Sequence, residues 1–346
     1  MLDTRYPFFS AYLKGEEARL VTSDHINRMT SISRLQDMLE IIKGTSLGSY
    51  LGGVLVETFD ELDGYLWRYL GDCLERVAWF KPVPADMLKI LRAYTAKYDV
   101  LNIKAALGGI STGRPFPPIP IGVIHNYGLL TELGRAEDVA GLTAILARCQ
   151  LGDYVPALAG YQAEGGAESK LLAEARLDRV YYQNLLEAAR DTADGDTLAK
   201  VFSTMIDMKN LQVMLRAVIA STGSGAARYI VSGGYRLSGE AIRELLPLKI
   251  GDIPGRLADT PYRSVAEAVA NEYDRTRSLA VVDEVLEGHR FRLSREVLSP
   301  RVQSPLMIAW YLILKETEVR NLRLISKAVL DNIPVAGIKD YLVLAA

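Results

Sequence analysis

The stretch KETEVRNLRLISKA, residues 315–328, decides how this chain is interpreted, because its central motif occurs three times. In it, Asn321 follows an acidic residue by three positions and directly precedes a leucine. The same order recurs in IDMKNLQVMLRA, residues 206–217, and, with isoleucine in place of leucine, in KYDVLNIKAAL, residues 97–107. The three asparagines are 108 and 111 residues apart, and they are Asn102, Asn210 and Asn321.

A second marker repeats with nearly the same period. LGSY (47–50) and LGDY (151–154) share one pattern, and DTPY (259–262) is a looser third copy. Self-similarity at a fixed period indicates a repeat architecture. We therefore predict a short N-terminal extension followed by three homologous helical repeats. Their bounds are 1–21 for the extension, 22–122 for repeat 1, 123–234 for repeat 2 and 235–346 for repeat 3.

The remaining sequence favours helices throughout. Apolar residues recur at three- and four-residue spacing in long stretches rich in Leu, Ala, Glu, Arg and Lys. No stretch alternates for long enough to suggest a sheet, so the predicted fold class is all-α. Helices are expected over about 29–42, 59–78, 85–110, 170–190, 196–220, 238–247, 264–290 and 304–330. Helix boundaries are expected at Pro84 and Ser238, which precede helices, and at Gly108-Gly109, which follow one.

The repeated acid lies inside the apolar stripe of its helix. At 100° per residue, the position three before the asparagine falls at about 60°, between apolar positions at about 40° and 80°. A buried polar pair needs partners, because an unsatisfied polar group costs about 1–3 kcal/mol. We therefore expect each pair to tie its helix to backbone groups of the neighbouring helices of its own repeat. These structural pairs are Asp99 with Asn102, Asp207 with Asn210, and Glu318 with Asn321.

A catalytic acid–base role for these pairs is the alternative, but no histidine or lysine partner recurs at a fixed spacing. The stretch GGISTGR, residues 108–114, has the glycine spacing of a phosphate-binding loop. It carries Arg114 where that loop needs lysine and Pro115 where it needs serine or threonine. We interpret it as a helix end followed by a loop.

The bulk composition excludes several other classes of protein. Lys+Arg number 40 against Asp+Glu 42, with no basic tail, so the charge does not indicate a nucleic-acid partner. The cysteines, Cys73 and Cys149, form no CxxC pair and are expected to be buried thiols. The three histidines lie far apart, so we expect neither a metal site nor a cofactor. No apolar run reaches about 18 residues, so the chain is expected to be soluble.

Basic residues surround the third marker. Arg320 and Arg323 fall outside the apolar stripe, and Lys315 and Lys327 lie nearby. Such residues form either a solvated face or an interaction face for an acidic partner helix. The candidate partner contacts are Arg216, Arg320 and Arg323.

The sequence resembles the C subunit of archaeal and bacterial V/A-type rotary ATPases, which is similar to the d subunit of the eukaryotic V-ATPase. The C-terminal helix of that family looks like Y-x-x-x-K-E-x-E-x-x-N-[LI]-R. This chain matches it in order within residues 304–328, at Tyr311, Lys315, Glu316, Glu318, Asn321, Leu322 and Arg323. DRVYYQNLLEAAR (178–190), IDMKNLQVMLRA and the GG-x-x-LS pattern at 233–238 also resemble the family. The resemblance covers nearly the full length and is weakest over the first fifty residues.

This resemblance implies an all-helical, funnel-shaped protein with three homologous units around a pseudo-threefold axis. Members of the family are not enzymes. They seat the central stalk of the soluble ATPase sector on the membrane rotor ring of proteolipid subunits and transmit torque for H⁺ or Na⁺ transport. The chain would then lie at the cytoplasmic face of the membrane as a peripheral protein, held through protein contacts. Two alternatives remain open here: a helical-repeat scaffold that binds an unrelated partner, and an enzyme acting at one acid–asparagine pair.

Overall fold

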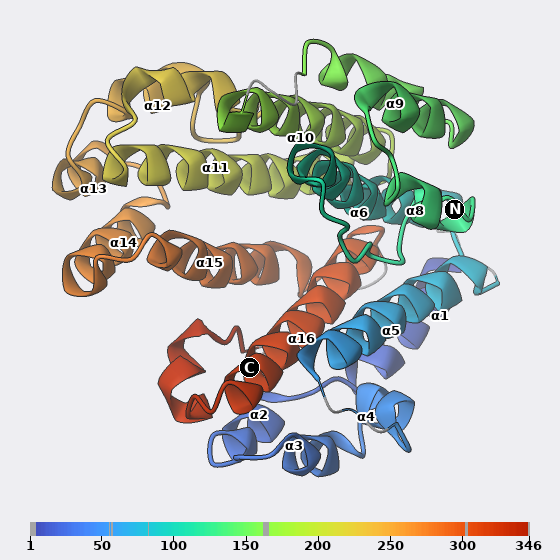
Figure 1. Ribbon diagram of the computed structural model, residues 1–346. Coiled ribbons are helices and arrows are strands. Elements are labelled where there is room, and N and C mark those ends of the chain that lie inside the picture. The colour runs from blue at the N-terminus through green and yellow to red at the C-terminus, as the bar shows by residue number, and fades with distance from the viewer. Residues whose placement is uncertain are drawn as a thin grey trace. The chain divides into compact units, whose positions relative to one another are not determined.

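The chain folds into helices joined by short connections (Figure 1). The computed structural model describes residues 5–54, 56, 58–81, 83–161, 166–301 and 304–344. Every regular element in these ranges is a helix, which confirms the predicted all-α class. The chain divides into two compact units, and the divisions fall within the helices α6 and α15. Compact unit 1 comprises Met1–Leu91 and Phe291–Ala346, and compact unit 2 comprises Arg92–Arg290.

Long helices account for most of the structure. They are α5 (Phe59–Trp79), α6 (Ala85–Thr112), α10 (Gly166–Arg190), α11 (Gly195–Ile219), α15 (Ala280–Leu298) and α16 (Leu306–Leu330). The shorter α-helices are α1 (Arg5–Glu17), α2 (Ser23–Met29), α3 (Leu35–Ile42), α4 (Ser46–Leu51), α7 (Val123–Asn126), α8 (Leu130–Leu133), α9 (Val139–Arg148), α12 (Gly239–Leu245), α13 (Ile253–Arg256) and α14 (Arg263–Thr276). The 3-10 helices of the described ranges are η1 (Gly152–Leu158), η3 (Gly223–Tyr229), η4 (Ile250–Asp252) and η5 (Val335–Tyr341).

Helix α16 forms the centre of compact unit 1. Its first nine residues, LMIAWYLIL, are all buried, as expected for a helix that is apolar on every side. It packs against α1, α3, α5 and η5, and Figure 1 shows it running beside α5. Helix α5 begins at a capping box, in which the Thr58 side chain and the Glu61 side chain satisfy each other's backbone N–H groups.

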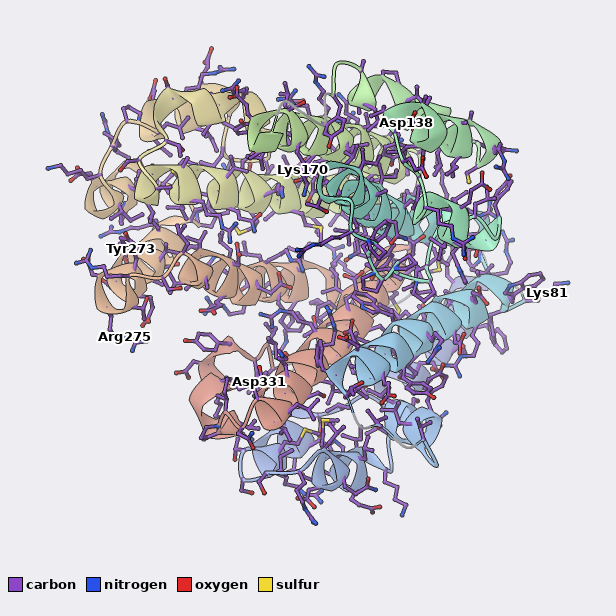
Figure 2. The ribbon with its side chains drawn as sticks, in the orientation of Figure 1. Lys81, Asp138, Lys170, Tyr273, Arg275 and Asp331 are labelled. Carbon is purple, nitrogen blue, oxygen red and sulfur yellow. The ribbon has the colours of Figure 1, made fainter. Side chains whose placement is uncertain are left out.

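Compact unit 2 is built around the pair α10 and α11, which lie side by side in Figure 1. Helix α10 also packs against η1 and η3, and α11 also packs against η3 and α12. Ser238 caps α12 by accepting a hydrogen bond from the N–H of Ala241, which confirms the predicted helix start. Charged side chains such as Arg275 extend outward from the helices, as Figure 2 shows.

Three predicted helix bounds were wrong. The segment 29–42 contains the end of α2 and then α3, and the segment 264–290 is divided between α14 and α15. The second break occurs at Arg277, which takes the left-handed conformation with φ of 54° although no glycine marks it in the sequence. Helix α6 continues through Gly108-Gly109 to Thr112, because the cost of about 1 kcal/mol per helical glycine is small against the packing of a long helix.

Candidate functional site

Each repeated asparagine binds both backbone groups of one residue further along the chain. The Asn102 side-chain amide donates to the Ile119 carbonyl (2.9 Å), and the Ile119 N–H donates to Asn102 Oδ1 (2.8 Å). An amide side chain offers one donor group and one acceptor, so it can pair with an extended backbone as a neighbouring strand would. The other two asparagines make the same two bonds, Asn210 with Val231 (2.8 and 2.8 Å) and Asn321 with Val343 (2.7 and 3.0 Å). All three asparagines are buried.

The first carboxylate binds the start of a helix. Asp99 accepts hydrogen bonds from the N–H groups of Val123 (2.8 Å) and Ile124 (2.9 Å), the first two residues of α7. Gly122 makes this approach possible, because a Cβ atom there would lie 2.6 Å from the carboxylate. Its φ of +106° also favours glycine. Burial raises the pKa of Asp99 to about 6, and the two backbone N–H groups act in the opposite direction.

The second carboxylate accepts three backbone N–H groups. Asp207 Oδ2 accepts from Arg236 (2.7 Å) and Tyr235 (3.2 Å), and Asp207 Oδ1 accepts from Leu237 (3.3 Å). The hydroxyl of Tyr262 donates to the same Oδ2 over 2.7 Å. This carboxylate therefore has four donors around it, and its side chain is fully buried.

Close packing and burial shape the environment of Asp207. A Cβ atom on Gly234 would lie 2.1 Å from Oδ1, so only glycine fits between the carboxylate and its donors. Burial raises the pKa of Asp207, and the bonds from Tyr262 and the backbone oppose that shift. Burial and the adjacent Asp207 charge raise the pKa of Tyr262, so this phenol stays protonated and donates.

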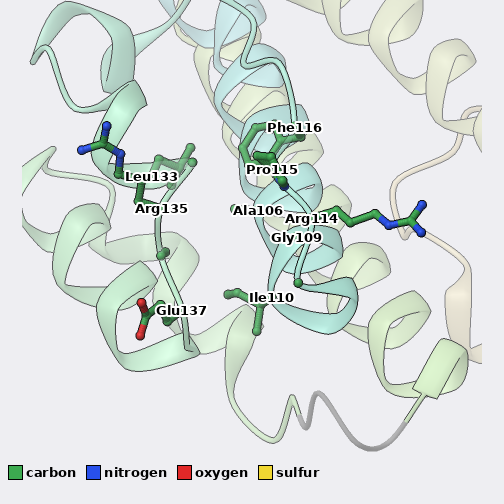
Figure 3. A pocket seen from close by; sticks show the side chains of 12 residues that line it. Ala106, Gly109, Ile110, Arg114, Pro115, Phe116, Leu133, Arg135 and Glu137 are labelled. Carbon is green, nitrogen blue, oxygen red and sulfur yellow. The ribbon is translucent and has the colours of Figure 1, made fainter.

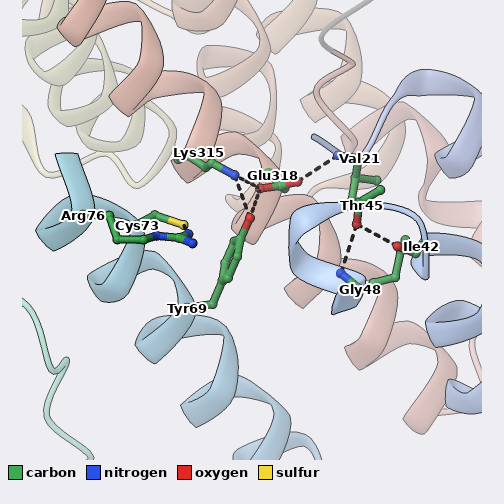
Figure 4. A network of polar contacts seen from close by, with 9 residues as sticks. All are labelled: Val21, Ile42, Thr45, Gly48, Tyr69, Cys73, Arg76, Lys315 and Glu318. Carbon is green, nitrogen blue, oxygen red and sulfur yellow. Dashed lines mark hydrogen bonds and ion pairs between the residues drawn. The ribbon is translucent and has the colours of Figure 1, made fainter. Parts of the chain in front are cut away.

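The third carboxylate is part of a buried ionic network, drawn in Figure 4. Glu318 Oε1 accepts from the Val21 N–H (2.8 Å), and Oε2 accepts from Lys315 Nζ (3.1 Å) and from the Tyr69 hydroxyl (3.3 Å). Lys315 Nζ also donates to the Tyr69 oxygen over 2.6 Å. The side chains of Lys315 and Glu318 are 0% and 2% exposed, so this is an ion pair removed from water.

The burial of Lys315 was not expected. Lys315 was grouped with the basic residues of a solvated or partner-binding face, and that grouping was wrong for this residue. The helical wheel contains the signal, because the position six before Asn321 falls at about 120°, beside the apolar stripe. A charged side chain at the edge of the apolar stripe is removed from water, so it needs a buried counter-charge. Glu318, three residues later, supplies that charge.

The carboxylates and the asparagines bind different parts of the predicted repeats. Each asparagine binds a residue within the predicted bounds of its own repeat, but this residue lies in a non-helical segment and not in a neighbouring helix as predicted. The carboxylates instead bind the N–H groups that open the next repeat, at Val123 for repeat 2 and at Tyr235 for repeat 3. Glu318 binds Val21, the residue directly before repeat 1. The first two polar pairs therefore each hold one connection at two points, whereas the third pair holds two separate segments, at Val343 and at Val21.

The three repeated tyrosines differ in their surroundings. The hydroxyl of Tyr262 donates to Asp207. Burial raises the pKa of Tyr154, and the charges of Asp153 and Asp99 add to this shift. At Glu318 the hydroxyl comes from Tyr69 of α5, not from the marker residue Tyr50, whose ring lies 5.4 Å from that of Tyr69. The spacing of the sequence markers does not indicate that Tyr69 lies beside Glu318.

The three candidate interface arginines all contact this chain. Arg323 pairs with Asp63 and lies 4.8 Å from the centre of the Trp67 ring. Arg320 donates to the carbonyl of Tyr341 over 3.0 Å, and Arg216 pairs with Asp283 over 2.6 Å. Arg216 is about half exposed and also lines a pocket of about 510 Å³ on compact unit 2. A partner-binding role for the three arginines stays a prediction.

The glycine-rich stretch that resembles a phosphate-binding loop lines a separate pocket of about 340 Å³. Its backbone is helical through Thr112, so it does not form a loop that could surround a phosphate. Figure 3 shows the Arg114 side chain extending away from Leu133 and Glu137, which line the other side. The geometry fits the predicted helix end, displaced to Gly113 with its φ of +66°.

The cysteines are buried in the fold, and His25 caps a helix. Both cysteines are free and buried, as predicted. His25 Nδ1 accepts from the Thr22 N–H over 3.0 Å and completes the capping box of α2. Across the described ranges, no group of three or more His, Cys, Asp or Glu side chains is placed to hold a metal ion. None of the described helices is both long enough and apolar enough to cross a membrane.

Comparisons with known proteins agree on one family. The family model described as ATP synthase (C/AC39) subunit matches residues 9–341. The C subunit of the A-type ATP synthase of Methanocaldococcus jannaschii is 24% identical over 354 residues, which cover 98% of this chain and 86% of the relative. The corresponding protein of Methanothermobacter thermautotrophicus is 27% identical, covering 92% and 84%. That of Thermococcus onnurineus is 25% identical, covering 97% and 90%.

Proposed function

Because this chain belongs to the ATP synthase (C/AC39) subunit family, we propose that it is the non-catalytic coupling subunit of a V/A-type rotary ATPase. In that role it seats the central stalk of the soluble sector on the membrane rotor ring and transmits torque between them. The family match over residues 9–341 carries the proposal. The relatives named as C subunits of A-type ATP synthases, which cover this chain almost completely, support it.

The repeated ties support a three-unit architecture. We propose that the three repeats close around a pseudo-threefold axis as a funnel, with each carboxylate joining one repeat to the next. Asp99 and Asp207 bind the starts of repeats 2 and 3, and Glu318 binds the residue before repeat 1, which supports a closed circuit. A closed circuit suits a part that carries torque, because no joint between repeats is left without a buried hydrogen bond.

The same geometry argues against a catalytic role. Asp207 accepts from three backbone N–H groups and a tyrosine and is fully buried, so a substrate in solution has no access to it. Asp99 accepts from two backbone groups at a helix start, and Glu318 is held by Lys315 and Tyr69. A general base must reach a substrate proton within hydrogen-bonding distance, and these carboxylates are already occupied.

The proposed partners are the central stalk subunits and the proteolipid ring, and the proposed location is the cytoplasmic face of the membrane. Arg216, Arg320 and Arg323 are proposed as contacts. The side chains of Arg216 and Arg323 are 47% and 36% exposed, so replacing their internal carboxylate partner by one on another protein costs little electrostatic energy. The alternative of a scaffold for an unrelated partner has no support beyond the helical repeats themselves.

Co-purification tests the proposal. The purified chain is mixed with purified central stalk subunits, and separately with membranes that contain the rotor ring, and complexes are separated by size or by sedimentation. We expect a complex in both mixtures. If the folded chain binds neither stalk nor ring, the coupling role is excluded and the scaffold alternative is favoured.

A further inference from the structure

Aromatic side chains gather where α1 meets the end of α5, and two of them are exposed while two are partly buried. We call this cluster the aromatic tip, and it consists of Phe8, Tyr12, Trp79 and Phe80. The ring of Phe80 is stacked 4.1 Å from Tyr12 and 5.8 Å from Phe8, measured between ring centres. Trp79 is 78% exposed and Phe8 is 57% exposed, which is unusual for side chains of this size.

The outer face of α1 extends the same apolar surface. Pro7, Phe8, Ala11 and Gly15 are all exposed, and none of them carries a polar side chain. A hydrogen bond from the Tyr6 hydroxyl to Asp86 fixes this end of α1 against the start of α6. The exposed residues therefore form an ordered apolar surface, and a binding partner would shield it from water.

Basic residues flank the aromatic tip. Arg5 and Lys81 are exposed beside it, and Figure 2 shows Lys81 extending beyond the end of α5. Arg76 is also exposed, about one turn of α5 before Trp79.

Three carboxylates lie at the level of Arg76 or further back. Asp72 and Glu75 of α5 are exposed, and the partly buried Glu16 of α1 acts electrostatically on both Tyr12 and Arg76. The terminal surface is therefore aromatic and basic, and the acidic residues lie back from it.

We propose that the aromatic tip inserts into the headgroup region of a membrane that contains anionic phospholipid. Tryptophan and tyrosine concentrate at membrane interfaces, and lysine and arginine beside apolar side chains add attraction to anionic headgroups. A protein partner would meet the apolar area equally well, but the basic flank favours an anionic lipid surface. This binding goes beyond the proposed coupling function and relies on it only for bringing the chain to a membrane.

Tryptophan fluorescence tests the proposal directly on the full chain. Of the three tryptophans, Trp310 is buried and Trp67 is partly covered by Arg323, so a change of emission on binding comes mainly from Trp79. Vesicles of phosphatidylcholine with phosphatidylglycerol should shift its emission to shorter wavelength, and brominated acyl chains should quench it. If neither change occurs, the proposal is wrong.

Matched variants distinguish binding through the aromatic tip from non-specific binding through other exposed apolar side chains. In vesicle sedimentation, Phe8→Ser combined with Trp79→Ser should lower binding about tenfold or more, because two apolar side chains are lost. Tyr127→Ser combined with Leu171→Ser removes side chains that are 47% and 48% exposed elsewhere and should leave binding unchanged. Lys81→Glu should weaken binding to anionic vesicles and leave binding to neutral ones unchanged.

Three results would overturn the lipid assignment. They are equal binding of the Phe8/Trp79 variant, an emission shift that grows with protein concentration without vesicles, and binding only to vesicles that carry ring protein. The second would indicate a second copy of the chain, and the third a protein partner. Protein-free vesicles contain neither stalk nor ring, so failure here leaves the coupling proposal intact, and failure of co-purification leaves this one intact.

Discussion

The backbone N–H of Val21 donates to Glu318 Oε1 over 2.8 Å, although 297 residues separate them. The bond joins the segment before repeat 1 to the last of the three repeated helices. Asp99 and Asp207 make corresponding bonds to segments only 24 to 30 residues away. Glu318, the acid of the third motif, accepts from one backbone N–H. Its other hydrogen bonds come from the ammonium of Lys315 and the hydroxyl of Tyr69.

The buried ion pair at this position should respond strongly to loss of one charge. Glu318→Gln keeps an oxygen for Val21 but leaves Lys315 without a counter-charge. We expect a loss of about 3–5 kcal/mol in the free energy of unfolding. Lys315→Met combined with Glu318→Gln removes both charges and should restore part of that loss.

Chemical denaturation of the parent, both single variants and the double variant gives the coupling energy between the two side chains. A double variant whose loss equals the sum of the single losses would contradict the ion-pair account. Retention of the Val21 bond in Glu318→Gln can be followed by amide exchange at Val21.

The asparagines should matter for the backbone groups they satisfy. Replacing Asn210 by leucine keeps the shape but leaves the N–H and carbonyl of Val231 without their partner. We expect a loss of about 1–3 kcal/mol for each group that stays buried and unsatisfied, measured as a shift of the denaturation midpoint. Asn271→Leu at an exposed helical position is the control and should change stability little. Equal effects at the two sites would contradict a tying role.

Gly234 should be required for the approach of Asp207. Its Cβ would lie 2.1 Å from Oδ1, and its backbone is not in the left-handed region, so the effect of alanine would be steric. Gly234→Ala should therefore destabilise the chain by more than about 2 kcal/mol in thermal or chemical denaturation. Gly239→Ala is the matched control, because its Cβ would have no atom closer than 4.0 Å. A Gly234→Ala variant as stable as this control would refute the steric account.

Stability should depend on pH through Asp99. Burial raises its pKa from 3.8 to about 6, so between these values the folded state binds the proton more tightly than the unfolded state. The contribution of Asp99 is then greatest below about pH 4 and is lost as the pH rises through about 6. The advantage of the parent over Asp99→Asn should fall by on the order of 2 kcal/mol from pH 4 to pH 7. An advantage that grows with pH would show that the carboxylate is favoured in its ionised form.

Much of the site could be predicted from the sequence because the motif repeats. The wheel places Asp99, Asp207 and Glu318 inside the apolar stripe, and all three are buried. The residues that the asparagines bind lie within the same predicted repeat, but in non-helical segments and not in the neighbouring helices that the prediction named. The resemblance to the V/A-type ATPase C subunit, which residues 304–328 carry most specifically, is confirmed by the family match over residues 9–341.

Other features depend on tertiary contacts that periodicity does not encode. Helical periodicity shows which face is buried, but it does not say which backbone segment meets a side chain, so the carboxylate partners in the next repeat were missed. Tyr69 lies beside Glu318 because α5 packs on α16, a contact between residues 249 positions apart. The turn at Arg277 has no glycine or proline to mark it.

Ion transport tests the central claim most directly. The ATPase is assembled with and without this chain in proteoliposomes, and ATP hydrolysis and ATP-driven ion uptake are measured together. The account predicts that the assembly without the chain still hydrolyses ATP but takes up no ions, and that adding the chain restores uptake. ATP-driven uptake at the full rate without the chain, or hydrolysis that itself requires the chain's carboxylates, would contradict the account.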